Sequence, residues 1–315
     1  MWQLSAGIFL GWALGSNDAS NIFGTAVASR MIRFWTAAIL CSIFVLLGAI
    51  IQGSNGIETY HAMSRISHIN TAFVVSFSSA LAVTMMTYWK LPVSTSHAVV
   101  GSLIMVGLAN GRLELMPLVK IIICWVSAPF GAMIIAYVLF YAIGQLLNWL
   151  DMDIFAYDRN MRIALILAGS YGAYALGANH VANVTGPFVG PGMLSPLQAC
   201  LVGGLSIAFG VLTNSRRVMM TVGRNLVKLD AYTAFIVVLS EAITVHTFAH
   251  VGVPVSTSQA VVGAVLGIGL VSGMRTVQLG TFGRIIFGWV CTPLISFTLT
   301  ASMLYTFRFI NRFLL

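Results

Sequence analysis

Long uninterrupted apolar runs constrain this chain more than any other feature of its sequence. Thr36 to Ile51, Ile121 to Ile143 and Ile285 to Leu304 are each close to or above the ~20 residues that cross a membrane as a helix. Only α-helices and closed barrels satisfy every backbone polar group in lipid. Because the runs are continuous rather than alternating, they predict an all-α polytopic membrane protein rather than a barrel.

Charged residues are too scarce to cover a water-facing surface. They make up 8% of the 315 residues, whereas soluble domains have about a quarter. Basic residues such as Arg30, Arg33, Arg216 and Arg217 lie in short breaks between apolar runs. The net charge of +8 therefore indicates membrane-flanking charge, with lipid rather than nucleic acid as the partner. We expect an integral protein of the cell (inner) membrane of a prokaryote.

Two pairs of segments are duplicated at the same spacing. GSNDASNIFG at 15–24 resembles GANHVANVTG at 177–186, and PVSTSHAVVG at 92–101 matches PVSTSQAVVG at 254–263 in nine of ten positions. Both pairs have an offset of 162 residues (177 − 15 and 254 − 92). A shared offset near half the chain length indicates duplication of a whole unit.

The most polar connection between apolar runs lies at 148–162, so we predict two membrane domains at 1–150 and 151–315. At ~20 residues per span, the chain has room for about 10 to 12 transmembrane segments. Glycine and proline interrupt several of them, which predicts broken or re-entrant helices. Repeats with an odd number of spans are inverted in the membrane, with the substrate site near the midplane between them.

The asparagine motifs place polar side chains inside apolar segments. Asn17, Asp18 and Asn21 share one side of a helix, and Asn179, His180 and Asn183 occupy the matching positions. A lone asparagine in such a place usually joins two packed helices. Because the motif is duplicated and includes an ionisable residue, we interpret both copies as parts of a binding site.

The two Pro-Val-Ser-Thr-Ser segments have the pattern of helix starts, in which hydroxyl side chains cap free backbone N–H groups. Such helix N-termini bind anions through N–H donors and the helix dipole. The alternative interpretation is two ordinary capped helices at the membrane surface. Amide, hydroxyl and N–H donors suit a tetrahedral oxyanion, whereas carboxylates such as Asp18 suit an accompanying Na⁺ or proton. Together they indicate symport, with Glu241 as a second intramembrane acid.

An enzyme is the less favoured interpretation of the same residues. Ser94 and His97 are close enough in sequence for a Ser–His hydrolase, but the second copy has Gln259 in place of the histidine. Neither serine lies in a G-x-S-x-G motif, and the chain has no Walker-type phosphate loop. We therefore expect no enzymatic activity and no cofactor beyond a coupling ion.

These motifs together resemble the PiT-type inorganic phosphate transporter family, which carries two G-A-N-D-x-x-N motifs and two P-[VI]-S-x-[ST]-H segments. The resemblance covers nearly the whole chain, and it continues through 216–223 and Glu241. It implies two inverted repeats, a homodimer, and secondary active symport of phosphate, commonly with Na⁺. The implied substrate-binding residues are Asn17, Asp18, Asn21, Ser94, Thr95, Ser96, Asn179, His180, Asn183, Ser256, Thr257 and Ser258. The implied residues for Na⁺ or proton coupling are Asp18, Asn21, Asn183 and Glu241.

The sequence departs from the family pattern at two positions. His180 replaces the second aspartate, and Val45 stands where relatives often carry glutamate. Fewer carboxylates favour sulfate, a dianion that offers no proton to acceptors. We predict a phosphate symporter driven by Na⁺ or H⁺, with a proton-coupled sulfate permease as the alternative and a passive anion channel as a more distant one.

Overall fold

The structure of the chain is a computed structural model, which describes residues 1–64, 66–89, 93–225, 229–272 and 279–314. Within these ranges the chain forms α-helices and one 3₁₀ turn, η1 (Gly186–Phe188), and no strand. This confirms the all-α prediction. The helices are α1 (Leu4–Ala28), α2 (Phe34–Gln52), α3 (Asn55–Ser64), α4 (Ile69–Tyr88), α5 (Thr95–Ala109), α6 (Leu115–Leu150), α7 (Ile154–Thr185), α8 (Pro196–Asn225), α9 (Ala231–Val251), α10 (Thr257–Ser272) and α11 (Leu279–Leu314).

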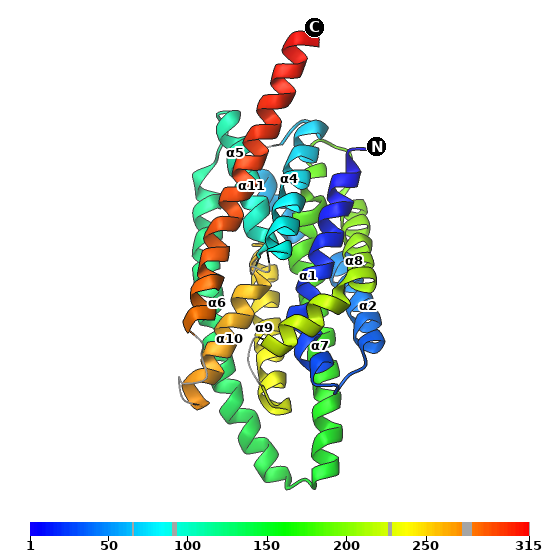
Figure 1. Ribbon diagram of the computed structural model, residues 1–315, viewed down its shortest axis with the longest axis vertical. Helices are drawn as coiled ribbons and strands as arrows, with labels where there is room; N and C mark the ends of the chain where they lie inside the picture. Colours follow the sequence, from blue (N-terminus) through cyan, green and yellow to red (C-terminus); the bar gives the residue numbers. More distant parts are fainter. Residues whose placement is uncertain (65, 90–92, 226–228, 273–278, 315) are drawn as a thin grey trace.

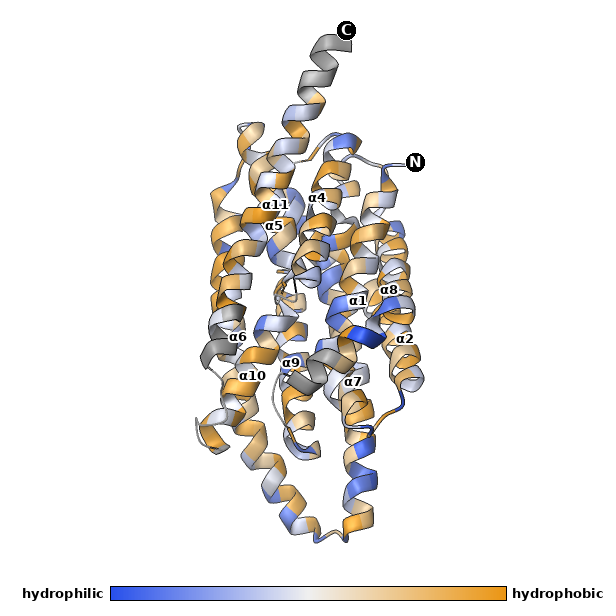
Figure 2. Ribbon diagram, in the orientation of Figure 1, coloured by the Kyte–Doolittle hydropathy of each residue, from blue (hydrophilic) through white to orange (hydrophobic). Residues whose placement is uncertain are grey.

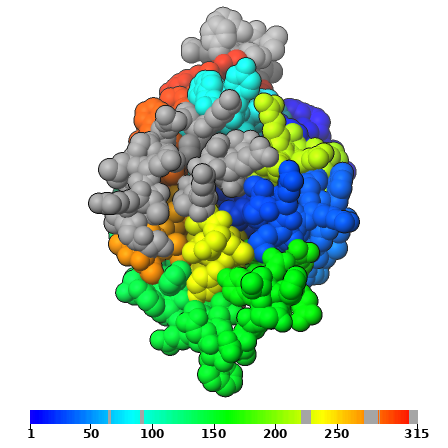
Figure 3. All heavy atoms as spheres, turned by 60° about the horizontal axis from the view of Figure 1, so that its bottom comes forward, coloured from blue at the N-terminus to red at the C-terminus, as the bar shows by residue number. Residues whose placement is uncertain are grey.

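The two halves of the chain run in opposite directions. In Figure 1 both termini lie at the upper end of the molecule, whereas the turn between α6 and α7 lies at the lower end. The first half therefore starts at the upper end, and the second half returns there from the lower one. Figure 3 looks more directly onto the lower end, where residues of α2, α7, α9 and α10 share one face. Both halves therefore contribute to each end of the molecule, as inverted repeats do.

Helices of one half pack against helices of the other half, and each such pair has an equivalent pair at the repeat offset. α1 packs against α8 while α2 packs against α7, and α5 packs against α11 while α6 packs against α10. Glycine allows the closest approaches. A Cβ built on Gly15 would lie 2.0 Å from the carbonyl oxygen of Ile207, and one on Gly177 would lie 1.9 Å from that of Val45. Only a hydrogen atom fits at either crossing, so the duplicated glycines hold the halves together.

Among the described residues, seven helices are long and apolar enough to cross a membrane, namely α2, α4, α6, α7, α8, α9 and α11, wholly or over most of their length. α1 has 25 residues, but its polar motif lowers its hydropathy. α5 and α10 have only 15 and 16 residues. At 1.5 Å per residue neither spans the ~30 Å of hydrocarbon. These two short helices are the broken segments that the sequence predicts, and each starts inside the bundle.

The outer helices present apolar side chains outward. On α2, the side chains of Ile39, Ile43 and Leu47 are 50%, 49% and 41% exposed at helical spacing. α6 repeats the pattern, with Ile123, Val126 and Phe130 exposed, and Figure 2 colours most of its ribbon as hydrophobic. A water-facing helix would carry polar residues on this side. The exposed apolar surface therefore faces lipid, as a polytopic membrane protein requires.

Candidate functional site: a polar centre between the repeats

The duplicated asparagine motifs meet in the interior, where α1 and α7 pack together. Asp18 and His180 occupy the same place in their repeats, because 180 − 18 is again 162. The two side chains are 3% and 1% exposed, and Asp18 Oδ2 lies 3.8 Å from His180 Nε2. A carboxylate from one half and an imidazole from the other therefore face each other at the interface between the repeats.

The segments before α5 and α10 cross each other at this interface. Ser96 Oγ donates to the carbonyl of Val255 over 3.2 Å, and Ser258 Oγ donates to that of Val93 over 3.4 Å. These two hydrogen bonds are equivalent, because Ser258 is the repeat counterpart of Ser96 and Val255 is that of Val93. Pro92 of the first segment lies outside the described residues. The crossing brings the N-terminal ends of the two broken helices together.

Both helix starts are capped as the sequence predicts. Ser94 Oγ accepts a hydrogen bond from the backbone N–H of His97 at 3.4 Å, and Ser256 Oγ accepts one from that of Gln259 at 3.3 Å. Capping occupies Ser94 as an acceptor, which is a structural role rather than that of a nucleophile. Beside it, the Oγ1 atom of Thr95 is buried and has no hydrogen-bond partner within the described residues.

Two asparagines join each helix motif to the opposite crossing segment. Asn21 Nδ2 donates to Thr257 Oγ1 over 3.2 Å, and Asn183 Nδ2 donates to Ser96 Oγ over 3.1 Å. Each bond runs from one repeat to the other. Amide and hydroxyl groups from both halves therefore lie at one centre, which is the arrangement that a shared anion site needs.

The other two asparagines hold the walls of this centre. Asn17 Nδ2 donates to Thr87 Oγ1 on α4 over 3.2 Å. Asn179 donates to the carbonyl oxygens of Val245 and Val253, and its Oδ1 accepts from the N–H of Val255 at 2.9 Å. Because Asn179 bonds on both sides of the break between α9 and α10, it fixes the path of the extended segment.

Acidic groups gather on one side of the centre. Glu241 on α9 is 1% exposed and interacts electrostatically with Asp18, and its Oε2 has no hydrogen-bond partner among the described residues. Thr257 contributes a side-chain hydrogen bond to Asp18. Carboxylate and hydroxyl oxygens from α1, α9 and α10 are the donors that a hard cation prefers. Val45 is buried and offers no further carboxylate.

The repeat comparison missed Tyr60 and Thr87. The Tyr60 hydroxyl on α3 donates to Asn183 Oδ1, and it is 2% exposed. The offset of 162 maps Tyr60 to Val222 and Thr87 to Ala249, so neither residue has a polar counterpart. Nothing in the duplicated motifs pointed to them.

Comparison with known proteins agrees with this geometry. The sequence matches the profile of the phosphate transporter family over residues 14–300. It is 32% identical to a predicted phosphate permease of Methanocaldococcus jannaschii, over 93% of each chain. It is also 25% identical to the sulfate permease CysP of Bacillus subtilis, over 95% of this chain and 86% of that one.

A solved structure, described as a sodium-dependent phosphate transporter, has the same fold. Its TM-score to this chain is 0.89 at 24% identity, and the match covers 98% of this chain and all of the other. The all-helical architecture, the apolar helices and the family match over most of the sequence lead to one conclusion. The chain is an integral membrane protein that belongs to the phosphate transporter family.

Proposed function

We propose that this chain is a secondary active symporter that carries inorganic phosphate across the membrane together with Na⁺ or H⁺. The observation that carries the proposal is a pair of hydrogen bonds between the repeats at the centre: Asn21 donates to Thr257, and Asn183 donates to Ser96. Neutral donors from both halves suit an oxyanion that must bind and leave again. An inverted repeat with its site at the interface suits alternating access.

The buried acids supply the cation side of the proposal. Asp18 is hydrogen-bonded by Thr257 and interacts electrostatically with Glu241, and this pair of carboxyl groups suits a coupling Na⁺ or proton that crosses with the anion. A passive channel would not need a buried carboxylate at this place. The function proposed is transport without covalent chemistry, in a homodimer located in a prokaryotic cell membrane.

Sulfate is the second candidate substrate, and His180 is the observation that favours it. An imidazole faces Asp18 where a symmetric site would have a second carboxylate. Fewer carboxylates leave fewer acceptors for the proton of a phosphate monoanion, whereas sulfate has no such proton. The similarity to a protein described as a sulfate permease supports the same alternative.

Uptake into proteoliposomes tests both the anion and the coupling ion. Labelled phosphate and labelled sulfate are each offered with an imposed Na⁺ gradient, an imposed proton gradient, or neither. We expect phosphate to accumulate above its external concentration under at least one gradient. Preferential accumulation of sulfate would support the alternative, and flux without accumulation would support a channel. No uptake of either anion under any gradient would contradict the transporter proposal.

A further inference from the structure

The two repeats bury their halves of the site unequally. Asn183 and Ser96 are completely buried. Their counterparts at the repeat offset, Asn21 and Ser258, are each partly exposed. Thr25, one turn beyond Asn21 on α1, is partly exposed as well. The centre is therefore sealed beside Asn183 and partly open along the C-terminal half of α1.

Helix α3 provides the seal, and it has no separate counterpart in the second repeat. The offset of 162 maps α3 onto positions 217–226, which fall mainly within the continuous helix α8. Two hydrogen bonds fix α3 in place: Thr59 Oγ1, at the middle of the helix, donates to the carbonyl of Gly252 over 2.6 Å, and the N–H of Glu114 donates to that of Met63 near its end over 3.1 Å. α3 is thus a separate helix in the first repeat only, where the second repeat has the continuous helix α8, and it lies over one side of the site.

Tyr60 connects α3 to the site. Its hydroxyl donates to Asn183 Oδ1, and Asn183 Nδ2 donates in turn to Ser96 Oγ. Ser96 Oγ donates in turn to the carbonyl of Val255. One line of hydrogen bonds therefore links α3, α7, α5 and the segment before α10. While Tyr60 is bound in this way, the amide oxygen of Asn183 is occupied.

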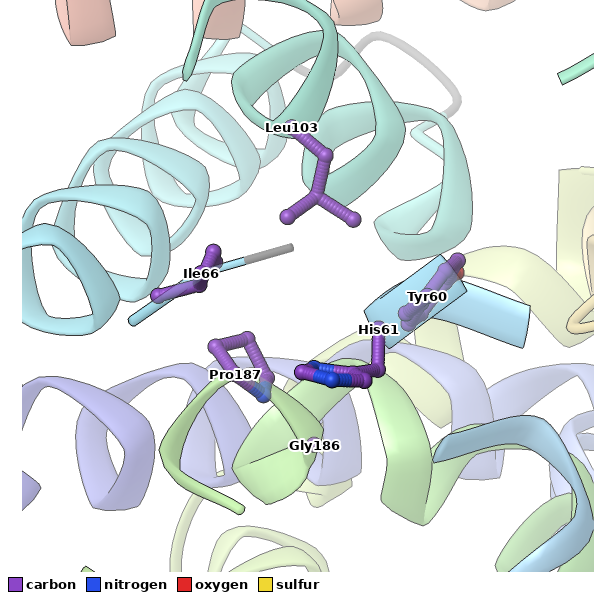
Figure 4. A pocket seen from close by; sticks show the side chains of 6 residues that line it. All are labelled: Tyr60, His61, Ile66, Leu103, Gly186 and Pro187. Carbon is purple, nitrogen blue, oxygen red and sulfur yellow. The ribbon is translucent and has the colours of Figure 1, made fainter. Parts of the chain in front are cut away.

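A small pocket of about 10 Å³ lies on the other side of the Tyr60 ring, at the lower limit for one water molecule. Figure 4 shows it between α3, α5 and η1, with His61, Leu103 and Pro187 among its walls. The hydroxyl of Tyr60 points away from this space. Tyr60 thus stands between the polar centre and the pocket, and displacement of its side chain would join the two.

We propose that Tyr60 is the gate of the anion site on the α3 side. Its hydrogen bond to Asn183 holds the site closed there, and it must break for an anion to pass between the centre and the pocket. This inference rests on the proposed transport function. It goes further in two ways. It assigns the closure of the α3 side to Tyr60, which lies outside the duplicated motifs, and it gives the two sides of the site different gates.

Accessibility of the site to a thiol reagent tests the gate. Ser96→Cys is made in a chain whose four cysteines, Cys41, Cys124, Cys200 and Cys291, are replaced by alanine. The protein is reconstituted in liposomes, and a membrane-impermeant methanethiosulfonate is applied to each face in turn. Labelling of position 96 is then compared with and without Tyr60→Phe. Tyr88→Phe is the matched control, because Tyr88 is 84% exposed on the outside of the bundle.

We expect Tyr60→Phe to raise the labelling rate from one face about tenfold, the shift that loss of one buried hydrogen bond gives to an opening equilibrium. Tyr88→Phe should label at the rate of the parent. Labelling of Tyr60→Phe at the parent rate from both faces would overturn the proposal. This readout does not require transport, so it stands even if neither anion is carried.

A cross-link supplies a second test that leaves Tyr60 in place. A Cβ built on Gly56 of α3 lies 2.9 Å from the Cβ of Ala182 on α7, about 1 Å inside the ~3.8 Å of a disulfide, so the two helices must part slightly for the bond to form. In Gly56→Cys/Ala182→Cys, oxidation should lower anion uptake at least about tenfold, and reduction should restore it. The single variant Ala182→Cys should be insensitive to oxidation. Unchanged uptake after complete cross-linking would overturn the gate. If Tyr60→Phe does not fold, the cross-link decides alone.

Discussion

The two repeats have the same helix packing and the same helix caps, but they place different ionisable residues at the centre. Both have a glycine at the closest helix crossing, a serine cap at the broken helix and a serine bond to the opposite segment. They differ in the ionisable groups, with Asp18 in one half and His180 in the other. The shared residues fix the architecture, whereas the residues that differ set charge and access.

The position of Glu241 shows the same contrast. Its counterpart is Ser79, which hydrogen-bonds with Ser102 over 3.0 Å, while Ser102 lies 2.5 Å from Ser296. Ser79 thus belongs to a neutral hydroxyl cluster, whereas its counterpart in the second half is an acid. Because Glu241 interacts with Asp18, the carboxylates of both halves act on one side of the centre rather than on two symmetric sides.

Asp18→Asn should produce the largest change, because it removes the only acid that the asparagine motifs contribute. Without this carboxylate the coupling cation or proton loses its ligand in the motif, so we expect concentrative uptake to fall by more than about 100-fold, which corresponds to about 2.8 kcal/mol. The initial rate of uptake into proteoliposomes measures this. Asp158→Asn is the control, since Asp158 pairs with Arg162 on the surface. Accumulation at the control rate would show that Asp18 is not needed for coupling, whereas flux without accumulation would favour a channel.

Asn183→Ala and Asn21→Ala test whether both halves bind one anion. Each should weaken phosphate binding about tenfold, and Asn183→Ala should weaken it more because it leaves two buried partners, Tyr60 and Ser96, without Asn183. Titration calorimetry on the purified protein gives both affinities. Asn160→Ala, outside the site on α7, should bind as the parent does. Normal affinity in either site variant would exclude that half from the site.

His180→Asp makes the two repeats alike at the position where they differ most. A second carboxylate adds oxygen ligands for a hard cation. We expect the share of uptake that depends on Na⁺ to rise several-fold over the parent, measured with and without Na⁺ at one pH. Equal Na⁺ dependence in parent and variant would mean that this residue does not set the coupling ion.

Gly15→Ala and Gly177→Ala test the frame that the repeats share. Each adds a methyl group within about 2 Å of a backbone carbonyl, so each should cost about 1–3 kcal/mol of folding free energy by overpacking. Because the crossings are equivalent, the two losses should be similar in thermal unfolding. Gly131→Ala is the control, since nothing lies within 4 Å of its Cβ position. A large loss for only one site variant would show that the crossings are not equivalent.

Sequence alone predicts most of the frame because the duplication repeats its signals. Continuous apolar runs predict the helices, and the Pro-Val-Ser-Thr-Ser segments predict the starts of α5 and α10, which the structure confirms. The approach of Asp18 to His180 depends on how the halves cross, and no local pattern records that. Tyr60 lies on a short helix without a repeat counterpart, so neither periodicity nor duplication identifies it. The domain division near residue 150 and the substrate-binding roles stay predictions.

The number of anions bound per chain tests the account most directly. The account holds that two unequal halves form one site, so titration calorimetry with phosphate, or with sulfate if uptake selects it, should give one anion per chain. Asn21→Ala and Asn183→Ala should each weaken that one event. Two anions per chain, with each variant losing only one of them, would contradict the account.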